Sequence, residues 1–258
     1  MNAATLSPLF ALGLFIGMLV LLESGRRIGL RRVRQESDGA FKGIGTIEGA
    51  VFGLLGLLIA FTFSGAASRF DERRQLVTVE ANNISTAWLR IDALPADAQP
   101  MMRDLFRQYL DSRLETFRRL PDIAAAKEEL AHSVKLQGEI WSHAIVALRE
   151  PGAERATMLV LPALNQMIDI TTTRIMATER HPPMIIFFML ALLAFAGALL
   201  AGYATAGSKT RNWLHSAAFA AVVSITVYII IDIEYPRLGL IRVDAADEVL
   251  VELRKSMN

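Results

Sequence analysis

The sequence predicts an all-α integral membrane protein with four transmembrane helices in two hairpins and a helical aqueous domain between the hairpins. Three observations support this fold class. Hydrophobic residues make up 53% of the 258-residue chain, more than in an ordinary soluble protein. Four apolar stretches each have roughly the 17 to 25 residues that cross a hydrocarbon core of about 30 Å. Between the hairpins, apolar residues recur at the spacing of amphipathic helices.

The first hairpin comprises residues 1–68, with spans at residues 6–22 and 49–67 and a basic loop between them. The N-terminal tail carries no Lys or Arg, so the positive-inside rule predicts that the loop is cytoplasmic and that both termini and the aqueous domain lie outside. We expect the first span to be retained, because the basic cluster follows the apolar run, whereas a signal peptide would begin with it. The basic residues of the loop are Arg26, Arg27, Arg31, Arg32, Arg34 and Lys42.

The predicted aqueous domain spans residues 69–181, and no Gly-Pro break separates it from the second span. We therefore expect that span to continue as an amphipathic helix from Gly49 to Ile91, on the order of 65 Å long at 1.5 Å per residue. Prolines divide the rest of the domain into three more helices. The predicted buried stripes are Phe70, Val77, Ala81, Ile84, Trp88 and Ile91; Met102, Phe106, Tyr109, Phe117 and Leu120; Leu130, Val134, Trp141, Ile145 and Leu148; and Leu164, Ile168, Thr171 and Ile175.

The second hairpin comprises residues 182–232, with spans at residues 184–203 and 213–231, and an amphipathic tail follows at residues 233–258. Small residues spaced four apart occur in three of the spans. Such faces allow membrane helices to approach closely, so we expect them to be packing surfaces. They are Gly13 and Gly17, Gly49 and Gly53, and Ala194, Ala198 and Gly202.

Several function classes find no support in the sequence. The balance of 27 basic and 26 acidic residues, without a basic cluster of the required size, argues against a nucleic-acid partner. The chain has no cysteine, and its four histidines are not spaced as metal ligands, so no metal or other cofactor is predicted. The glycine-rich segment "GIGTIEGAVFGLLG" lacks both a preceding strand and a Gly-Lys-Ser/Thr ending. No catalytic motif is present, and we expect no enzyme.

The second span carries one face that could line a pore. Along this face, the side chains change from apolar to hydroxyl-bearing toward the aqueous domain. Around a symmetry axis, Leu57 and Phe61 would form a hydrophobic constriction and the serines a wetter vestibule. The same face could equally be a packing surface within one bundle. The pore-lining candidates are Gly53, Leu57, Phe61, Ser64 and Ser68.

Other polar residues each allow two interpretations. Glu48, Asp232 and Glu234 stand at the ends of spans, where they could line the mouth of a pathway or simply contact water and headgroups. Two polar stripes in the aqueous domain could form buried hydrogen-bonded networks or solvated faces. These stripes are Glu80 with Asn83, and Asn165 with Asp169 and Thr172.

Three segments resemble the bestrophin-like family of bacterial membrane proteins: "LIAFTFSGAASRFDERRQLVTVEANNISTAWLRIDALP", "LPALNQMIDITTTR" and "DIEYPRLGLIRVDA". The resemblance covers most of residues 40–255. It implies a distant relation to bestrophins, which are pentameric anion channels with a hydrophobic neck on the second transmembrane helix, and it puts Phe61 at a neck-like position. It further implies a bacterial inner-membrane protein, a homo-oligomer in the lipid bilayer, and inorganic anions as partners.

Two functional hypotheses follow. The first is an oligomeric anion channel whose second span lines the pore. The alternative is a non-conducting, membrane-anchored interaction or sensor module, which the long aqueous domain and the lack of charge within the spans would suit. The resemblance also implies a cytosolic large domain, whereas the basic loop predicts an external one, and we retain the prediction from the loop.

Overall fold

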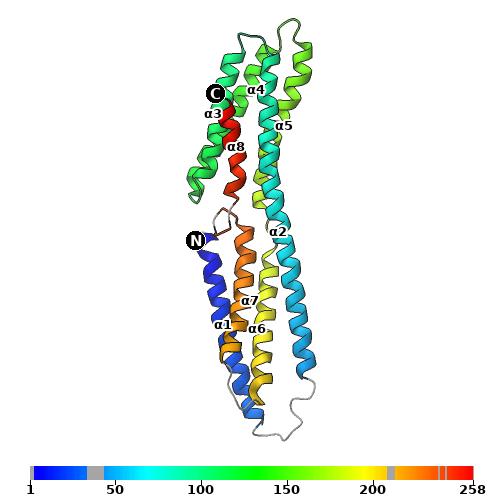
Figure 1. Cartoon of the computed structure of the whole chain (residues 1–258), viewed down its shortest axis with the longest axis vertical. Coiled ribbons are helices and arrows are strands. Elements are labelled where there is room, and N and C mark those ends of the chain that lie inside the picture. Colours follow the sequence, from blue (N-terminus) through cyan, green and yellow to red (C-terminus); the bar gives the residue numbers. More distant parts are fainter. Residues whose placement is uncertain (1–2, 34–43, 208–212, 238, 242, 258) are drawn as a thin grey trace. The chain divides into compact units, whose positions relative to one another are not determined.

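The computed structural model of the protein describes residues 3–33, 44–207, 213–237, 239–241 and 243–257. Across these ranges all regular structure is helical and no strand occurs (Figure 1). The elements are α1 (Ala3–Val33), α2 (Ile44–Arg90), η1 (Ile91–Ala93), α3 (Gln99–Arg118), α4 (Ile123–Ala147), α5 (Glu154–Glu179), α6 (Met184–Ala204), η2 (Thr205–Gly207), α7 (Trp213–Glu234) and α8 (Asp244–Ser256).

Among the described residues, four segments are long and apolar enough to cross a membrane, and they contain the predicted spans in α1, α2, α6 and α7 to within one residue at their starts. α1 continues past the predicted end of its span as far as Val33. Arg34 and Lys42, two members of the predicted basic loop, lie outside the described residues. α2 is one uninterrupted helix of 47 residues, as predicted from the absence of a break near Ala67.

The chain forms two compact units, which we call unit 1 (Met1–Ser68 and His181–Tyr235) and unit 2 (Arg69–Arg180 and Pro236–Asn258). Unit 2 includes most of the segment that the sequence predicts to be an amphipathic tail, residues 233–258. The reason is that Leu250 on α8 and Met257 directly after it lie in the same apolar core as α3, since the apolar face of α8 needs a partner.

In unit 1, α1 packs along α6 and α7 (Figure 1). The α1–α6 contact requires glycine: a Cβ on Gly25 would lie 2.0 Å from the Leu199 carbonyl oxygen, and one on Gly202 would lie 2.0 Å from the Leu22 carbonyl oxygen. The small face predicted on α6 therefore packs against α1. The glycine pair predicted on α2 behaves differently, because Cβ atoms on Gly49 and Gly53 would meet nothing within 4 Å.

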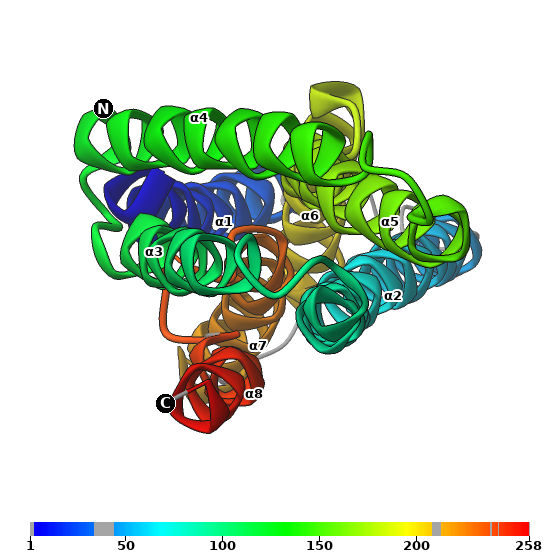
Figure 2. The same ribbon diagram turned by 90° about the horizontal axis from the view of Figure 1, so that it is seen from above.

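Unit 2 is built from the C-terminal part of α2 with α3, α4, α5 and α8, and α3 and α4 lie next to each other (Figure 2). Its helix boundaries follow sequence signals. The Asp122 carboxylate accepts hydrogen bonds from the backbone N–H groups of Ala124 and Ala125 at the start of α4. Gly152 adopts φ +91° in the turn before α5, a conformation that favours glycine.

The predicted stripes of unit 2 fit α2, α3 and α5 better than α4. Val77, Ile84, Phe106 and Leu164 lie in the core. On α4 the prediction was only partly right, because Val134 is exposed and the other members of its stripe are partly buried, with Trp141 and Leu148 packed against the edge of the core. The face that packs is instead Ala126, Ser133, Leu136, Gln137, Ile140, Ala144 and Ala147, whose polar members make it look solvated in the sequence.

Candidate functional site

The predicted pore-lining face of α2 is uncovered within the chain. Gly53, Leu57, Phe61, Ser64 and Ser68 are all exposed. Phe61 is 68% exposed and Leu57 53%, which is unusual for large apolar side chains unless lipid or another subunit covers them. The stripe is therefore free for contacts outside this chain.

The opposite side of α2 attaches it to unit 1. Leu55, Thr62 and Ala66 are buried, and they lie about half a helical turn away from the exposed stripe. One turn before them, the ring of Phe52 meets the ring of Phe219 edge-on at 5.3 Å and packs over Gly197, where a Cβ would be only 2.8 Å from a ring carbon. α2 thus presents one face to its own chain and one outward.

The candidate mouth residues lie in different surroundings. Glu48 is half-buried, but Asp232 and Glu234 at the end of α7 are 3% and 1% exposed. One Glu234 oxygen lies 3.6 Å from Nδ1 of His181, whose ring stacks on Tyr235 at 4.4 Å. Asp232 and Glu234 are therefore buried within the single chain, and their predicted place at the mouth of a pathway stays a prediction.

Glu80 lies at the centre of a buried ionic cluster in unit 2. Arg113 Nε donates to Glu80 Oε1 over 2.7 Å, and Arg174 Nη1 donates to Glu80 Oε2. The three side chains come from α2, α3 and α5, and none is more than 6% exposed. Burial by itself would lower the pKa of Arg113, but the facing Glu80 carboxylate outweighs it and raises that pKa. Burial lowers the pKa of Arg174, whereas the two arginines lower that of Glu80 against the effect of its burial. The cluster therefore joins three helices through an ionic contact away from water.

Phe117 extends this cluster to α8. Its ring contacts three guanidinium groups: the Cζ atoms of Arg113, Arg174 and Arg237 lie 5.3, 4.3 and 4.2 Å from the ring centroid. Arg237 in turn donates two hydrogen bonds to Asp247, of 2.7 and 3.0 Å. The aromatic ring thus lies between cations from three parts of the chain.

A second buried network is uncharged. Gln137 Nε2 donates to the Tyr109 hydroxyl over 3.0 Å and to Thr171 Oγ1 over 2.9 Å, and the two hydroxyls are 3.2 Å apart. Burial raises the pKa of Tyr109, and the nearby Glu80 charge raises it further, so the phenol stays protonated. This network fixes the register of α4 against α3 and α5.

The predicted polar stripes divide between buried and exposed positions. Glu80 is buried, while Asn83 is half-buried and donates to the Gln166 carbonyl over 3.1 Å. Asn165, Asp169 and Thr172 are exposed on α5. The neighbouring positions Thr171 and Arg174 are the ones that enter the core.

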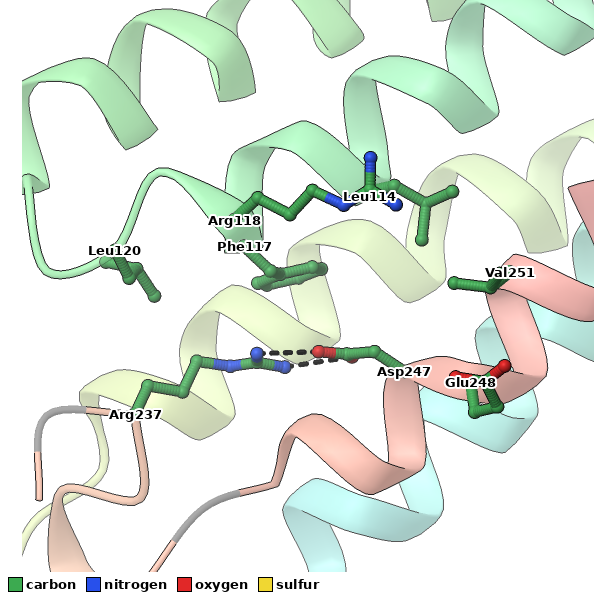
Figure 3. Close-up of a pocket in the computed structure, with 8 residues that line it drawn as sticks. All are labelled: Leu114, Phe117, Arg118, Leu120, Arg237, Asp247, Glu248 and Val251. Carbon is green, nitrogen blue, oxygen red and sulfur yellow. Dashed lines mark hydrogen bonds and ion pairs between the residues drawn. The ribbon is translucent and has the colours of Figure 1, made fainter. Parts of the chain in front are cut away.

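A pocket of about 290 Å³ adjoins the ionic cluster (Figure 3). Figure 3 shows the Arg237–Asp247 pair on one side of the Phe117 ring and the Arg118 side chain on the other. Its lining residues are Leu114, Phe117, Arg118, Leu120, Arg237, Asp247, Glu248 and Val251. No group of three or more His, Cys, Asp or Glu able to hold a metal occurs in the part of the chain that the structure describes.

Sequence reasoning missed Arg113, Arg174, Arg237 and Asp247. A signal was present for two of them: Arg113 falls in the predicted stripe between Tyr109 and Phe117, and Arg174 follows Thr171 by one turn on the apolar side of α5. An arginine at a core position of a helix needs a buried carboxylate partner. That rule would have drawn attention to Glu80.

Comparison with known proteins agrees with this architecture. A family model for the Bestrophin-like domain matches residues 15–247, which is most of the chain. The chain belongs to the Bestrophin-like family. No curated protein sequence matches it.

Solved structures of bestrophin homologues share the fold. A tryptophan-to-alanine variant of a bacterial bestrophin homologue from Klebsiella pneumoniae aligns with a TM-score of 0.67 at 15% identity, covering 96% of this chain and 96% of that one. A tyrosine-to-alanine variant of a homologue from the same organism gives 0.65 at 16% identity, covering 94% and 98%. At this identity the likeness establishes the fold of this Bestrophin-like chain and not its activity.

Proposed function

We propose that this protein is an oligomeric anion channel of the bacterial inner membrane in which α2 lines the pore. The observation that carries the proposal is the uncovered stripe of Gly53, Leu57, Phe61, Ser64 and Ser68, opposite the face that attaches α2 to its own chain. Several copies around an axis would cover this stripe and give it a function. Membership of the Bestrophin-like family supports both the channel and the homo-oligomer.

In the proposed pore, Leu57 and Phe61 form the narrow apolar section. A ring of large apolar side chains gates by excluding water, while the hydroxyl groups of Ser64 and Ser68 hydrogen-bond to hydrated ions beyond it. Glycine at position 53 adds no side chain to the pore wall. No charged side chain is required at the constriction for this mechanism.

The test is chloride entry into liposomes that contain the purified protein and a halide-sensitive dye. Phe61→Ala shortens the constricting side chain and should raise flux several-fold, because a wider ring stays wet. Phe188→Ala on α6 is the matched control, since Phe188 is a phenylalanine of almost equal exposure, 69%, on another span. It should leave flux unchanged.

Equal flux through the wild type, Phe61→Ala and Leu57→Ala would refute the proposed constriction. No flux from a folded oligomer would refute the channel itself. That second result would favour the membrane-anchored interaction or sensor module, and would direct attention to partners of unit 2.

We further propose that unit 2 and both termini lie outside the cytoplasm. The support is the basic residues Arg26, Arg27, Arg31 and Arg32 at the C-terminal end of α1, set against an N-terminal tail without any basic residue.

A further inference from the structure

We propose that the pocket beside Phe117 is a binding site for a small organic monocarboxylate with an apolar body. The inference does not depend on the channel proposal, because the pocket lies wholly in unit 2 and binding can be measured without ion flux. Its volume, about 290 Å³, is at the small end for ligand sites, which typically measure about 300 to 1,000 Å³.

One wall of the pocket is apolar. It is formed by Leu114 and Phe117 of α3, Leu120 in the turn after α3, and Val251 of α8 (Figure 3). Such a wall favours a hydrocarbon or aromatic body, which gains free energy by leaving water. A bare inorganic ion would gain nothing from it.

The polar lining favours a carboxylate. Arg118 is exposed, and no described carboxylate lies within ion-pair distance of its guanidinium, so its donors are available for a forked contact with a carboxylate. Arg237 is less available, because both of its terminal nitrogens already donate to Asp247. Arg118 is therefore the residue that we expect to hold the ligand.

The surroundings of Phe117 reinforce this choice. The guanidinium groups of Arg113 and Arg174 pack against the Phe117 ring. Nη1 of Arg113 is buried without a hydrogen-bond partner among the described residues. The three guanidinium groups around the ring, those of Arg113, Arg174 and Arg237, face two carboxylates, Glu80 and Asp247, so this cluster keeps one excess positive charge, which attracts an anion. A doubly charged phosphate suits the site poorly, because Asp247 and Glu248 also line the pocket and would repel the second charge.

The experiment is isothermal titration calorimetry on the full chain purified in detergent, with benzoate as the probe at constant chloride concentration. We expect saturable binding of one benzoate per chain. Benzyl alcohol, with the same ring but no charge, should bind at least tenfold more weakly. A charge-assisted contact is worth about tenfold or more in affinity, so Arg118→Gln should weaken benzoate binding by that factor.

Two further variants are expected to tighten benzoate binding or to leave it unchanged. Glu248→Gln removes a repulsive carboxylate from the lining and should tighten benzoate binding a few-fold. Arg119→Gln is the matched control, because Arg119 is the next residue, is also exposed, and does not line the pocket. It should change the affinity by less than twofold.

Absence of benzoate binding would overturn the proposal. So would equal affinities in the wild type and Arg118→Gln, equal weakening by Arg119→Gln, or binding of benzyl alcohol as tight as that of benzoate. No binding, or equal affinity in the wild type and Arg118→Gln, would mean that benzoate does not bind at Arg118. Equal weakening by Arg119→Gln would mean that any nearby positive charge suffices, and equally tight binding of benzyl alcohol would mean that apolar contact alone explains the affinity. A failed flux assay has no bearing on any of these outcomes.

Discussion

Arg113 Nε donates a 2.7 Å hydrogen bond to Glu80, between side chains that are 1% and 0% exposed. The two residues lie on α3 and α2, 33 positions apart in the chain. A buried ion pair does not by itself stabilise a fold more than apolar packing would, but removal of one partner leaves an uncompensated buried charge. Glu80 and its two arginines therefore make unit 2 sensitive to substitution at this point.

Glu80→Ala should lower the free energy of unfolding by about 3 to 5 kcal/mol, the range for a broken buried ion pair. Here two guanidinium groups would lose their carboxylate. Chemical denaturation of the protein in detergent, followed by circular dichroism, measures the change. Glu72→Ala provides the control, because the Glu72 side chain is 49% exposed and its Oε1 lies 3.6 Å from Nη1 of the exposed Arg180. Similar losses in both variants would contradict a special role for the buried cluster.

Gly25→Ala should disrupt the packing of α1 on α6. The added Cβ would meet the Leu199 carbonyl oxygen at 2.0 Å, a backbone atom that cannot turn aside, so a loss of at least about 1 to 3 kcal/mol is expected. Thermal unfolding in detergent measures this loss of stability. Gly13→Ala on the same helix has nothing within 4 Å of the new methyl group and should be tolerated. Equal stability of the two variants would show that α1 and α6 are not so closely packed.

Gln137→Ala should destabilise unit 2 by about 1 to 3 kcal/mol, since it removes the donor that serves Tyr109 and Thr171 in a buried site. Gln108→Ala is the comparison. Gln108 donates to Asp104 over 2.7 Å on an exposed face of its own helix, so little change is expected. Both variants can be compared by denaturant midpoint, and a neutral Gln137→Ala would mean that water replaces the amide without cost.

Topology can be measured with a compartment reporter fused to the C-terminus. Our assignment expects activity from a periplasmic reporter and none from a cytoplasmic one, because the basic residues at the end of α1 should stay inside. Replacing Arg26, Arg27, Arg31 and Arg32 by glutamine should then weaken or invert the orientation. Activity of the cytoplasmic reporter alone would reverse the assignment of both termini and unit 2.

The sequence was sufficient to predict helices and spans, because both depend on local properties. Membrane-spanning length and apolar composition marked α1, α2, α6 and α7, and the absence of a helix breaker near Ala67 predicted the continuity of α2. The α4 stripe shows where this reasoning fails. Ser133 and Gln137 look like solvated positions until Tyr109 and Thr171 are known to lie opposite Gln137.

The membrane class, the all-α architecture and the stripe from Gly53 to Ser68 as a candidate surface thus follow from the sequence alone. Three features emerge from the folded chain instead: Glu80 is buried between Arg113 and Arg174, α8 belongs to unit 2, and Phe117 and Arg118 border a pocket. The difference lies in how far along the chain each interaction acts. Helix propensity and hydropathy depend on residues close together in the sequence. A buried charge is stable only beside a partner, which here comes from a helix distant in sequence and cannot be identified from a local pattern.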